Sequence, residues 1–167
     1  MMHDLSQIKA LVFDLDGTLI DSEPIHAANE KRAFKEFGLN VLDFEWKGFK
    51  GKSALNIARY VIGKYGNGTN LTPEQFVERK TKLYLEVVKN IRFIEGAQRF
   101  LHAVKGSFDL GLVTSSKKVV QEAVFNNLEM NGIFKAIVTA DDIKEEEGKP
   151  HPMPFAKGIK LLGMRPE

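Results

Sequence analysis

Three apolar runs alternate with longer segments of helical periodicity along this chain. The runs predict strands at Lys9–Asp14, Asp109–Thr114 and Phe134–Thr139. In the first run, Leu11–Phe13 are apolar on both faces, which is typical of a strand covered in a parallel sheet. Strands that alternate with helices predict an α/β fold with a doubly wound parallel sheet.

The segment from Glu23 to Asn90 is predicted to be helical with little strand. Its first helix begins at Pro24 and ends at Gly38. Ser53 is expected to cap a second helix. Thr72–Gln75 begins a third, with proline at the first helical position and an acid–amide pair behind the cap. This block is therefore a helical insert that follows the first strand directly.

Later helices and a polar loop complete the alternation. The helices are expected around Phe100–Val104, Lys117–Asn127 and Phe155–Leu162, and the loop at Asp141–Gly148. We expect residues 1–20 and 92–167 to form one domain and residues 21–91 to form the second.

Composition narrows the possible functions. The chain has 167 residues, of which 43% are hydrophobic and 28% charged, as is usual for a soluble globular protein. A net charge of +2 implies no strong attraction to nucleic acid or membrane. The absence of cysteine excludes disulfides, thiolate metal sites and cysteine nucleophiles. No segment is apolar enough to span a bilayer and no signal segment begins the chain, so we expect a cytoplasmic protein.

Two carboxylates end the first strand. Asp14 and Asp16 stand two residues apart, so both side chains leave extended backbone on the same side, and Gly17 then allows a sharp turn. Open α/β sheets keep their active sites at this edge. Like charges this close repel unless a cation lies between them, and Mg²⁺ is the simplest cation with oxygen ligands. One carboxylate beside a metal can attack phosphorus while the other handles protons.

Two other loop types fit the sequence less well. A calcium-binding EF-hand loop requires glycine sixth and glutamate twelfth from its first acid, whereas Gly17 is fourth and Ile25 is twelfth. Gly51–Ser53 mimics the end of a phosphate-binding Walker A loop, but Trp46 stands where its first glycine belongs and no strand precedes it.

The string Leu11–Leu19, followed by Asp21–Pro24, resembles the first motif of the haloacid dehalogenase-like superfamily, whose phosphatases read Asp-x-Asp-Gly-Thr. Thr114 matches the second motif, a serine or threonine that ends the next strand. Lys149–Pro152 resembles the third, Lys-Pro-x-Pro. The resemblance implies a Rossmann-like parallel sheet core with an inserted α-helical cap.

The resemblance also implies roles for five residues. Asp14 is expected to attack phosphorus, and Asp16 to protonate the leaving group and then activate water. Thr114, Ser115 and Lys149 are expected to hold the phosphoryl oxygens. Asp14 and Asp16 are the expected ligands of Mg²⁺.

The helical insert stands where the family places its cap, which excludes water and recognises the substrate. His26 resembles a residue of many capped members, although a lone histidine on a helix is as often a surface or packing residue. Lys50 lies in Phe49–Ser53, which looks like the cap's specificity loop. It is either a contact to a second anionic group or a solvated lysine.

The fourth motif of the family is not found in this chain. In family members a further strand lies beside the first strand and ends in acids that complete the metal site. We therefore expect the C-terminal part of the core to be missing and Leu11–Phe13 to form an open edge, which favours strand addition or self-association. Glu145–Glu147 offer alternative carboxylates, but such runs normally form a solvated loop.

Three functions remain open. The first is a Mg²⁺-dependent phosphatase of a small phosphorylated metabolite, or a truncated form of one. The second is a sugar-phosphate mutase, which the resemblance disfavours because Ala54 stands where such mutases carry an arginine. The third is a catalytically incomplete chain that only binds phosphate or associates through its open edge.

Overall fold

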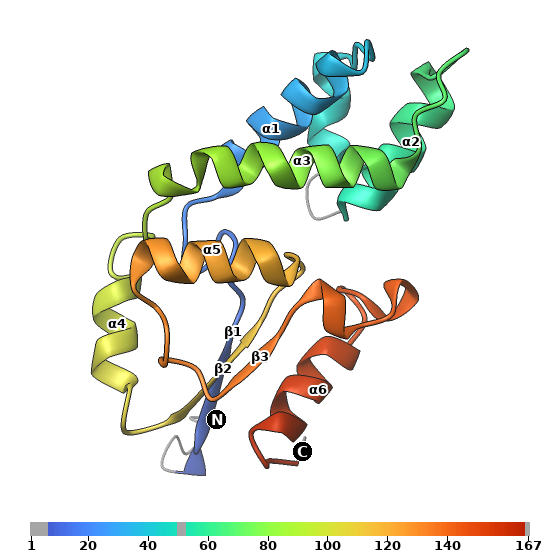
Figure 1. Cartoon of the computed structure of the whole chain (residues 1–167). Helices are drawn as coiled ribbons and strands as arrows, with labels where there is room; N and C mark the ends of the chain where they lie inside the picture. Colours follow the sequence, from blue (N-terminus) through green and yellow to red (C-terminus); the bar gives the residue numbers. More distant parts are fainter. Residues whose placement is uncertain (1–6, 50–52, 166–167) are drawn as a thin grey trace. The chain divides into compact units, whose positions relative to one another are not determined.

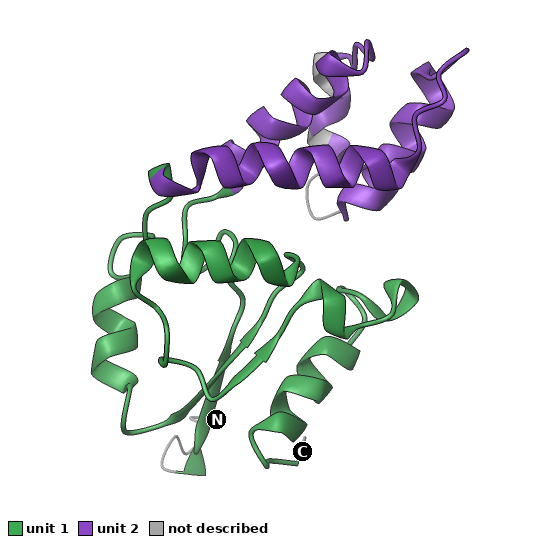
Figure 2. Ribbon diagram, in the orientation of Figure 1, with its two compact units in different colours: residues 1–22, 90–167 green, residues 23–89 purple. Residues whose placement is uncertain are grey.

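The computed structural model of the protein describes residues 7–49 and 53–165 (Figure 1). The chain divides into two compact units, which Figure 2 shows in different colours. We call residues 1–22 and 90–167 the sheet unit, and residues 23–89 the helical unit. The predicted boundaries at 21 and 91 lie two residues outside those of the helical unit.

The sheet unit contains a parallel sheet of three strands in the order β1-β2-β3. The strands are β1 (Ala10–Phe13), β2 (Asp109–Val113) and β3 (Ala136–Val138). The predicted α/β fold with a parallel sheet is thus confirmed, although β3 is shorter at both ends than predicted. Most of β2 is buried because it lies between two strands, whereas every residue of β1 is half-buried. Among the described residues β1 pairs with β2 alone.

Helices cover both faces of this sheet. They are α4 (Ala97–Val104), α5 (Lys118–Leu128) and α6 (Met153–Leu161). Gly111 of β2 faces α6, because a Cβ placed on it would lie 3.0 Å from the Leu162 side chain just beyond that helix. Phe13 points the other way, where its ring makes edge contacts with Phe100 of α4 and with Phe134. Side chains that alternate along the strands therefore pack against the helices on both faces of the sheet.

The two chain segments that lead to and from the helical unit are joined within the sheet unit. The Asp21 N–H donates to the Arg92 carbonyl at 3.0 Å, and the Ile94 N–H donates to the Leu19 carbonyl at 3.0 Å. The helical unit is therefore an insertion whose two ends leave the sheet unit side by side.

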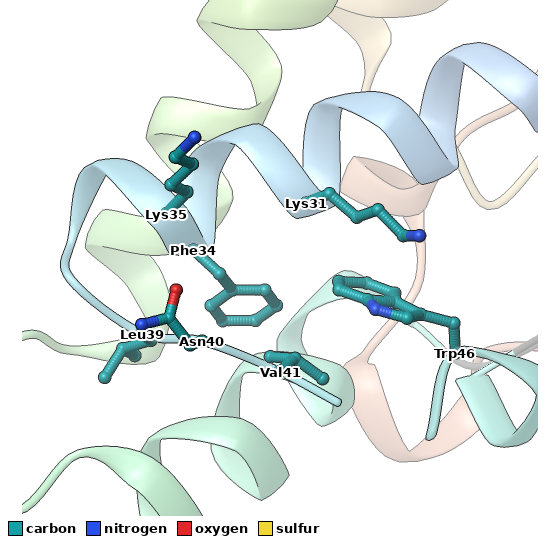
Figure 3. Close-up of a pocket in the computed structure, with 7 residues that line it drawn as sticks. All are labelled: Lys31, Phe34, Lys35, Leu39, Asn40, Val41 and Trp46. Atoms are coloured by element: carbon teal, nitrogen blue, oxygen red, sulfur yellow. The ribbon is translucent and has the colours of Figure 1, made fainter. Parts of the chain in front are cut away.

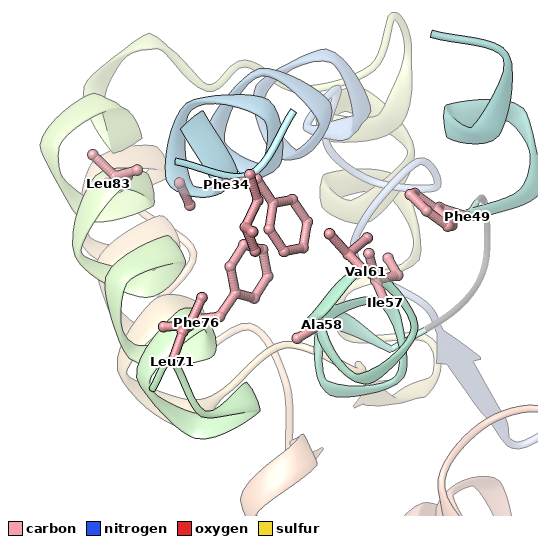
Figure 4. Close-up of a cluster of buried hydrophobic side chains, with 10 residues drawn as sticks. Phe34, Phe49, Ile57, Ala58, Val61, Leu71, Phe76 and Leu83 are labelled. Carbon is pink, nitrogen blue, oxygen red and sulfur yellow. The ribbon is translucent and has the colours of Figure 1, made fainter. Parts of the chain in front are cut away.

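The helical unit packs three helices around one apolar cluster. They are α1 (Glu23–Glu36), α2 (Ala54–Tyr65) and α3 (Pro73–Val87). Figure 4 shows the cluster, which consists of Ala33, Phe34, Leu39, Phe49, Ile57, Ala58, Val61, Leu71, Phe76 and Leu83. The predicted caps are confirmed: the Ser53 side chain accepts from the Asn56 N–H, and Thr72 and Gln75 form a capping box. Among the described helices, none is both long and apolar enough to cross a membrane.

One short helix was not predicted. The 3₁₀ helix η2 (Asp43–Phe49) carries Glu45, whose buried carboxylate accepts from Tyr60 Oη at 2.8 Å, from Lys64 Nζ at 2.7 Å and from Tyr65 Oη. Hydrogen bonds from Lys64 and then Tyr65 lower the pKa of Glu45 to about 2. This carboxylate fastens η2 to α2.

Further 3₁₀ turns follow α3 and β3. They are η3 (Val88–Asn90), at the end of the segment predicted to be helical, and η4 (Ala140–Asp142) and η5 (Glu145–Glu147), around the predicted loop. In η4 the Asp142 carboxylate accepts from the Thr139 N–H at 2.9 Å, and this bond lowers the pKa of Asp142. The polar segment after β3 is thus more regular than its composition indicates, and the Asp142 side chain caps the first of its two turns.

Gly158→Ala should destabilise the sheet unit. A Cβ there would lie 2.9 Å from Cγ2 of the buried Val113, so overpacking of about 1–3 kcal/mol outweighs the gain of about 1 kcal/mol in helix propensity. Gly63→Ala is the matched control, because that exposed helical glycine has no atom within 4 Å of the added Cβ. Urea unfolding followed by circular dichroism should show a loss for the first variant and a gain for the second. Equal stability of Gly158→Ala and wild type would contradict the close approach of α6.

The stability of the helical unit should depend on the ionisation of Glu45. Because the pKa of Glu45 falls from its usual 4.5 to about 2 on folding, ionised Glu45 contributes stability above pH 4.5 that is lost as pH falls toward 2. Trp46, the single tryptophan of the chain, reports unfolding of this unit by fluorescence. The difference between wild type and Glu45→Gln should be large at pH 7 and should shrink below pH 4.5. Glu78→Gln, at an exposed ion pair, should show no such change.

Candidate active site

The two acids of the first motif lie between β1 and a tight turn at residues 17–19. Gly17 adopts a φ of 72°, which favours glycine, and the carbonyl of the fully buried Leu15 accepts from the Leu19 N–H at 2.9 Å. Asp14 and Asp16 are both half-buried on either side of Leu15. The turn therefore presents two carboxylates at the carboxyl end of the strand while the apolar residue between them anchors the loop.

Lys149 joins this turn although it lies 135 residues away from Asp14 in the chain. Its Nζ donates to Asp14 Oδ1 and to the Val113 carbonyl, both at 2.7 Å. The Leu15 N–H also donates to Asp14 Oδ1, at 2.8 Å. Asp14 Oδ2 accepts no hydrogen bond from the described part of the chain, and 40% of the Asp14 side chain is exposed. One oxygen of Asp14 is thus held by two donors, whereas the other takes no described donor on a partly exposed side chain.

Three hydroxyl groups hold Asp16. Ser22 Oγ donates to Oδ1 at 2.6 Å, whereas Ser116 Oγ and Thr114 Oγ1 donate to Oδ2 at 2.8 and 3.3 Å. A hydroxyl can also accept a hydrogen bond, so the same groups can satisfy Asp16 after it takes up a proton. The surroundings of Asp16 therefore suit a group that changes its protonation state.

The loops that follow β2 and β3 are tied to each other. The Ala140 N–H donates to the Ser116 carbonyl at 3.0 Å, and the Lys118 N–H at the start of α5 donates to Asp141 Oδ2 at 2.7 Å. These bonds hold the segment that carries the Thr114 and Ser116 hydroxyls, which donate to Asp16.

The structure brings together four of the predicted site residues, namely Asp14, Asp16, Thr114 and Lys149. Ser115 is exposed between its neighbours, and the hydroxyl that reaches Asp16 is that of Ser116 instead. The role of Ser115 in phosphate binding stays a prediction.

The two predicted cap residues, His26 and Lys50, are not among the four residues above. His26 lies in the helical unit, where its ring stacks on Tyr84 with the centroids 4.6 Å apart. Lys50 lies outside the described residues. Contact of either residue with a substrate stays a prediction.

The sequence did not single out Ser22 or Ser116, although both donate to Asp16. Ser22 is completely buried, and its place within a polar run directly after the motif was the available signal. Ser116 offered none, because three consecutive hydroxyl residues follow β2 and only the turn decides which of them points to Asp16.

The site offers oxygen ligands that suit Mg²⁺. This ion binds through one or two carboxylates and keeps several waters. Asp14 Oδ2 and the backbone carbonyl of Asp16 fit this role, since both carboxylate oxygens of Asp16 are already bonded to hydroxyls. Within residues 7–49 and 53–165, no cluster of three or more His, Cys, Asp or Glu residues could hold a metal ion, and Glu145–Glu147 supply none.

A separate cavity of about 160 Å³ lies in the helical unit (Figure 3). It is lined by Lys31, Phe34, Lys35, Leu39, Asn40, Val41 and Trp46. Lys31 Nζ lies 5.3 Å from the centroid of the Trp46 ring. None of the predicted site residues lines this cavity.

Comparison with known proteins agrees with the motifs. Residues 11–167 match the family described as haloacid dehalogenase-like hydrolase. The chain belongs to this family. A phosphoglycolate phosphatase of Aquifex aeolicus is 31% identical over 165 residues, which cover 96% of this chain and 73% of that protein. The fructose-1-phosphate phosphatase of Escherichia coli is 26% identical over 160 residues, covering 93% and 81%.

A solved structure shows the same fold. CbbY from Rhodobacter sphaeroides, crystallised with phosphate, superposes with a TM-score of 0.82 at 22% identity and covers 94% of this chain and 73% of its own. The predicted membership of the haloacid dehalogenase-like family and the Rossmann-like fold are therefore confirmed. So is the predicted enzyme class of this family member, a phosphoric monoester hydrolase.

Ser22→Ala should destabilise the sheet unit by about 1.5–3 kcal/mol, because it removes a buried hydrogen bond to a carboxylate. Ser115→Ala removes an exposed hydroxyl whose two neighbours, and not Ser115 itself, donate to Asp16, so its stability should stay within about 0.5 kcal/mol of wild type. Urea unfolding at pH 7 measures both. Equal effects of the two substitutions would show that Ser22 does not hold Asp16.

Proposed function

We propose that this protein is a Mg²⁺-dependent phosphatase that hydrolyses a small phosphorylated metabolite through an aspartyl-phosphate intermediate. The observation that carries the proposal is the contact of Lys149 with Asp14, next to an Asp16 held by hydroxyls. The activities named for the similar phosphatases, on phosphoglycolate and fructose 1-phosphate, support a small phosphorylated substrate.

In the first step, a carboxylate oxygen of Asp14 attacks the phosphorus atom and the bond from phosphorus to the ester oxygen breaks. Protonated Asp16 gives its proton to the departing alkoxide, which leaves as an alcohol. The hydroxyls of Ser22 and Ser116 stabilise the Asp16 carboxylate that this transfer leaves behind.

In the second step, the Asp16 carboxylate takes a proton from water as the water oxygen attacks phosphorus. The bond between phosphorus and Asp14 breaks, which regenerates the Asp14 carboxylate and releases inorganic phosphate. Asp16 is again protonated, so the cycle closes without another reactant.

Cationic and hydroxyl groups hold the phosphoryl oxygens during both steps. Lys149 supplies positive charge beside Asp14, and Ser115 supplies a hydroxyl from the turn after β2. Thr114 joins them by exchanging its 3.3 Å hydrogen bond to Asp16 for one to a phosphoryl oxygen. Mg²⁺, when bound by Asp14 and the Asp16 carbonyl, offsets the charge of the phosphoryl group.

The helical unit is proposed to act as the cap that selects the substrate, with His26 and Lys50 as its contacts. We also propose a cytoplasmic protein without nucleic-acid or membrane partners. Self-association through the edge of β1 that no described strand pairs with would appear as a dimer in size-exclusion chromatography.

The proposed chemistry predicts hydrolysis of p-nitrophenyl phosphate that depends on Mg²⁺ and on Asp14. Chelation of Mg²⁺ should abolish release of p-nitrophenol, and Asp14→Asn should lower the rate at least about a thousandfold because it removes the nucleophile. Asp21→Asn is the matched control, since this exposed acid lies outside the described contacts of the site and should retain most activity.

The outcomes separate the candidate functions. Phosphate release from a sugar monophosphate without an activator supports the phosphatase, whereas a requirement for a bisphosphate would support the mutase. A folded wild-type chain that releases no phosphate from either type of substrate would contradict an active hydrolase and favour a chain that only binds.

A further inference from the structure

The Lys149 ammonium has a third neighbour besides its two oxygen partners. Its Nζ lies 5.1 Å from the centroid of the Phe155 ring, within the range of a cation–π contact. We propose that Phe155 is a positioning residue that holds the Lys149 ammonium between Asp14 and the phosphoryl oxygens. This inference rests on the proposed role of Lys149 as the phosphate-binding cation.

The backbone around Phe155 is fixed to the same strand residue that Lys149 contacts. Phe155 and Gly158 are three residues apart on α6, so they share one side of the helix. Gly158 lies close against the Val113 side chain, and the Val113 carbonyl accepts from Lys149 Nζ. The helix that carries the ring thus packs on the strand residue that supplies one oxygen partner of the ammonium.

An aromatic ring suits this place better than another oxygen. An ammonium has three N–H donors, and Asp14 and Val113 take two of them. A further oxygen acceptor would take the third, which a phosphoryl oxygen needs. The face of a ring attracts the charge without binding one particular N–H, so the third donor stays available.

Exposure distinguishes this contact from ordinary core packing. The Phe155 residue is 37% exposed and the Lys149 side chain 19% exposed. A ring that served only the apolar core would gain more by turning inward. Its place beside a half-buried ammonium instead shields the cation from water on one side.

The test compares binding of inorganic phosphate, in the presence of Mg²⁺, by three variants. Phe155→Leu keeps an apolar side chain but removes the ring face, and should weaken phosphate binding about three- to tenfold. Phe155→Tyr keeps the ring and should bind within about twofold of wild type. Phe100→Leu makes the same change at an exposed ring whose contact is Phe13, and should leave binding unchanged.

Two further readouts separate positioning from stability. In the hydrolysis of p-nitrophenyl phosphate, Phe155→Leu should raise KM more than it lowers kcat, and Phe155→Tyr should restore KM. In the proton NMR spectrum, the Lys149 ε-methylene signals of wild type should be displaced upfield by the ring. This displacement should persist in Phe155→Tyr and vanish in Phe155→Leu.

Wild-type phosphate affinity in Phe155→Leu, or undisplaced Lys149 signals in the wild-type spectrum, would overturn the inference. The wild-type and Phe155→Tyr spectra decide the matter even where Phe155→Leu does not fold. A wild-type chain without turnover would contradict the proposed function alone, because the NMR displacement tests the contact of Phe155 with Lys149 independently of catalysis.

Discussion

A single ammonium group holds the candidate active site together. Lys149 bonds to Asp14 after β1 and to the Val113 carbonyl at the end of β2, and it comes from the segment that follows β3. The Lys149 ammonium thus links the segments at the carboxyl ends of β1, β2 and β3. Asp14 and Asp16 bring two carboxyl groups to within three residues of each other, and the Lys149 ammonium offsets the charge of Asp14 while hydroxyls hold Asp16.

The parallel sheet makes this connection possible. Because β1, β2 and β3 run in the same direction, the segments that follow them meet at one edge. Small residues then decide how closely the layers approach, since Gly111 and Gly158 leave room for α6 against β2. The strand β2 therefore both binds Lys149 at its carboxyl end and sets how closely α6 packs on the sheet.

Features encoded by neighbouring residues could be predicted from the sequence. The turn at Gly17 and the caps at Ser53 and Thr72 each need only a few consecutive residues, and all are present. Features that depend on distant partners could not. Nothing near Glu45 indicates its bonds to α2, and choosing Ser116 over Ser115 requires the path of the loop after β3. Lys149 was found only because a family motif marks it.

The two backbone hydrogen bonds that join Leu19–Asp21 to Arg92–Ile94 have a consequence for how such proteins diversify. Holding the two ends of the insertion together costs conformational entropy that rises only slowly with the number of residues between them, by about 0.6 kcal/mol for each doubling of that number. Helices can be lengthened, exchanged or lost in that interval while the sheet edge that carries Asp14 and Asp16 keeps its geometry. Selection can then act on the two units separately within one polypeptide.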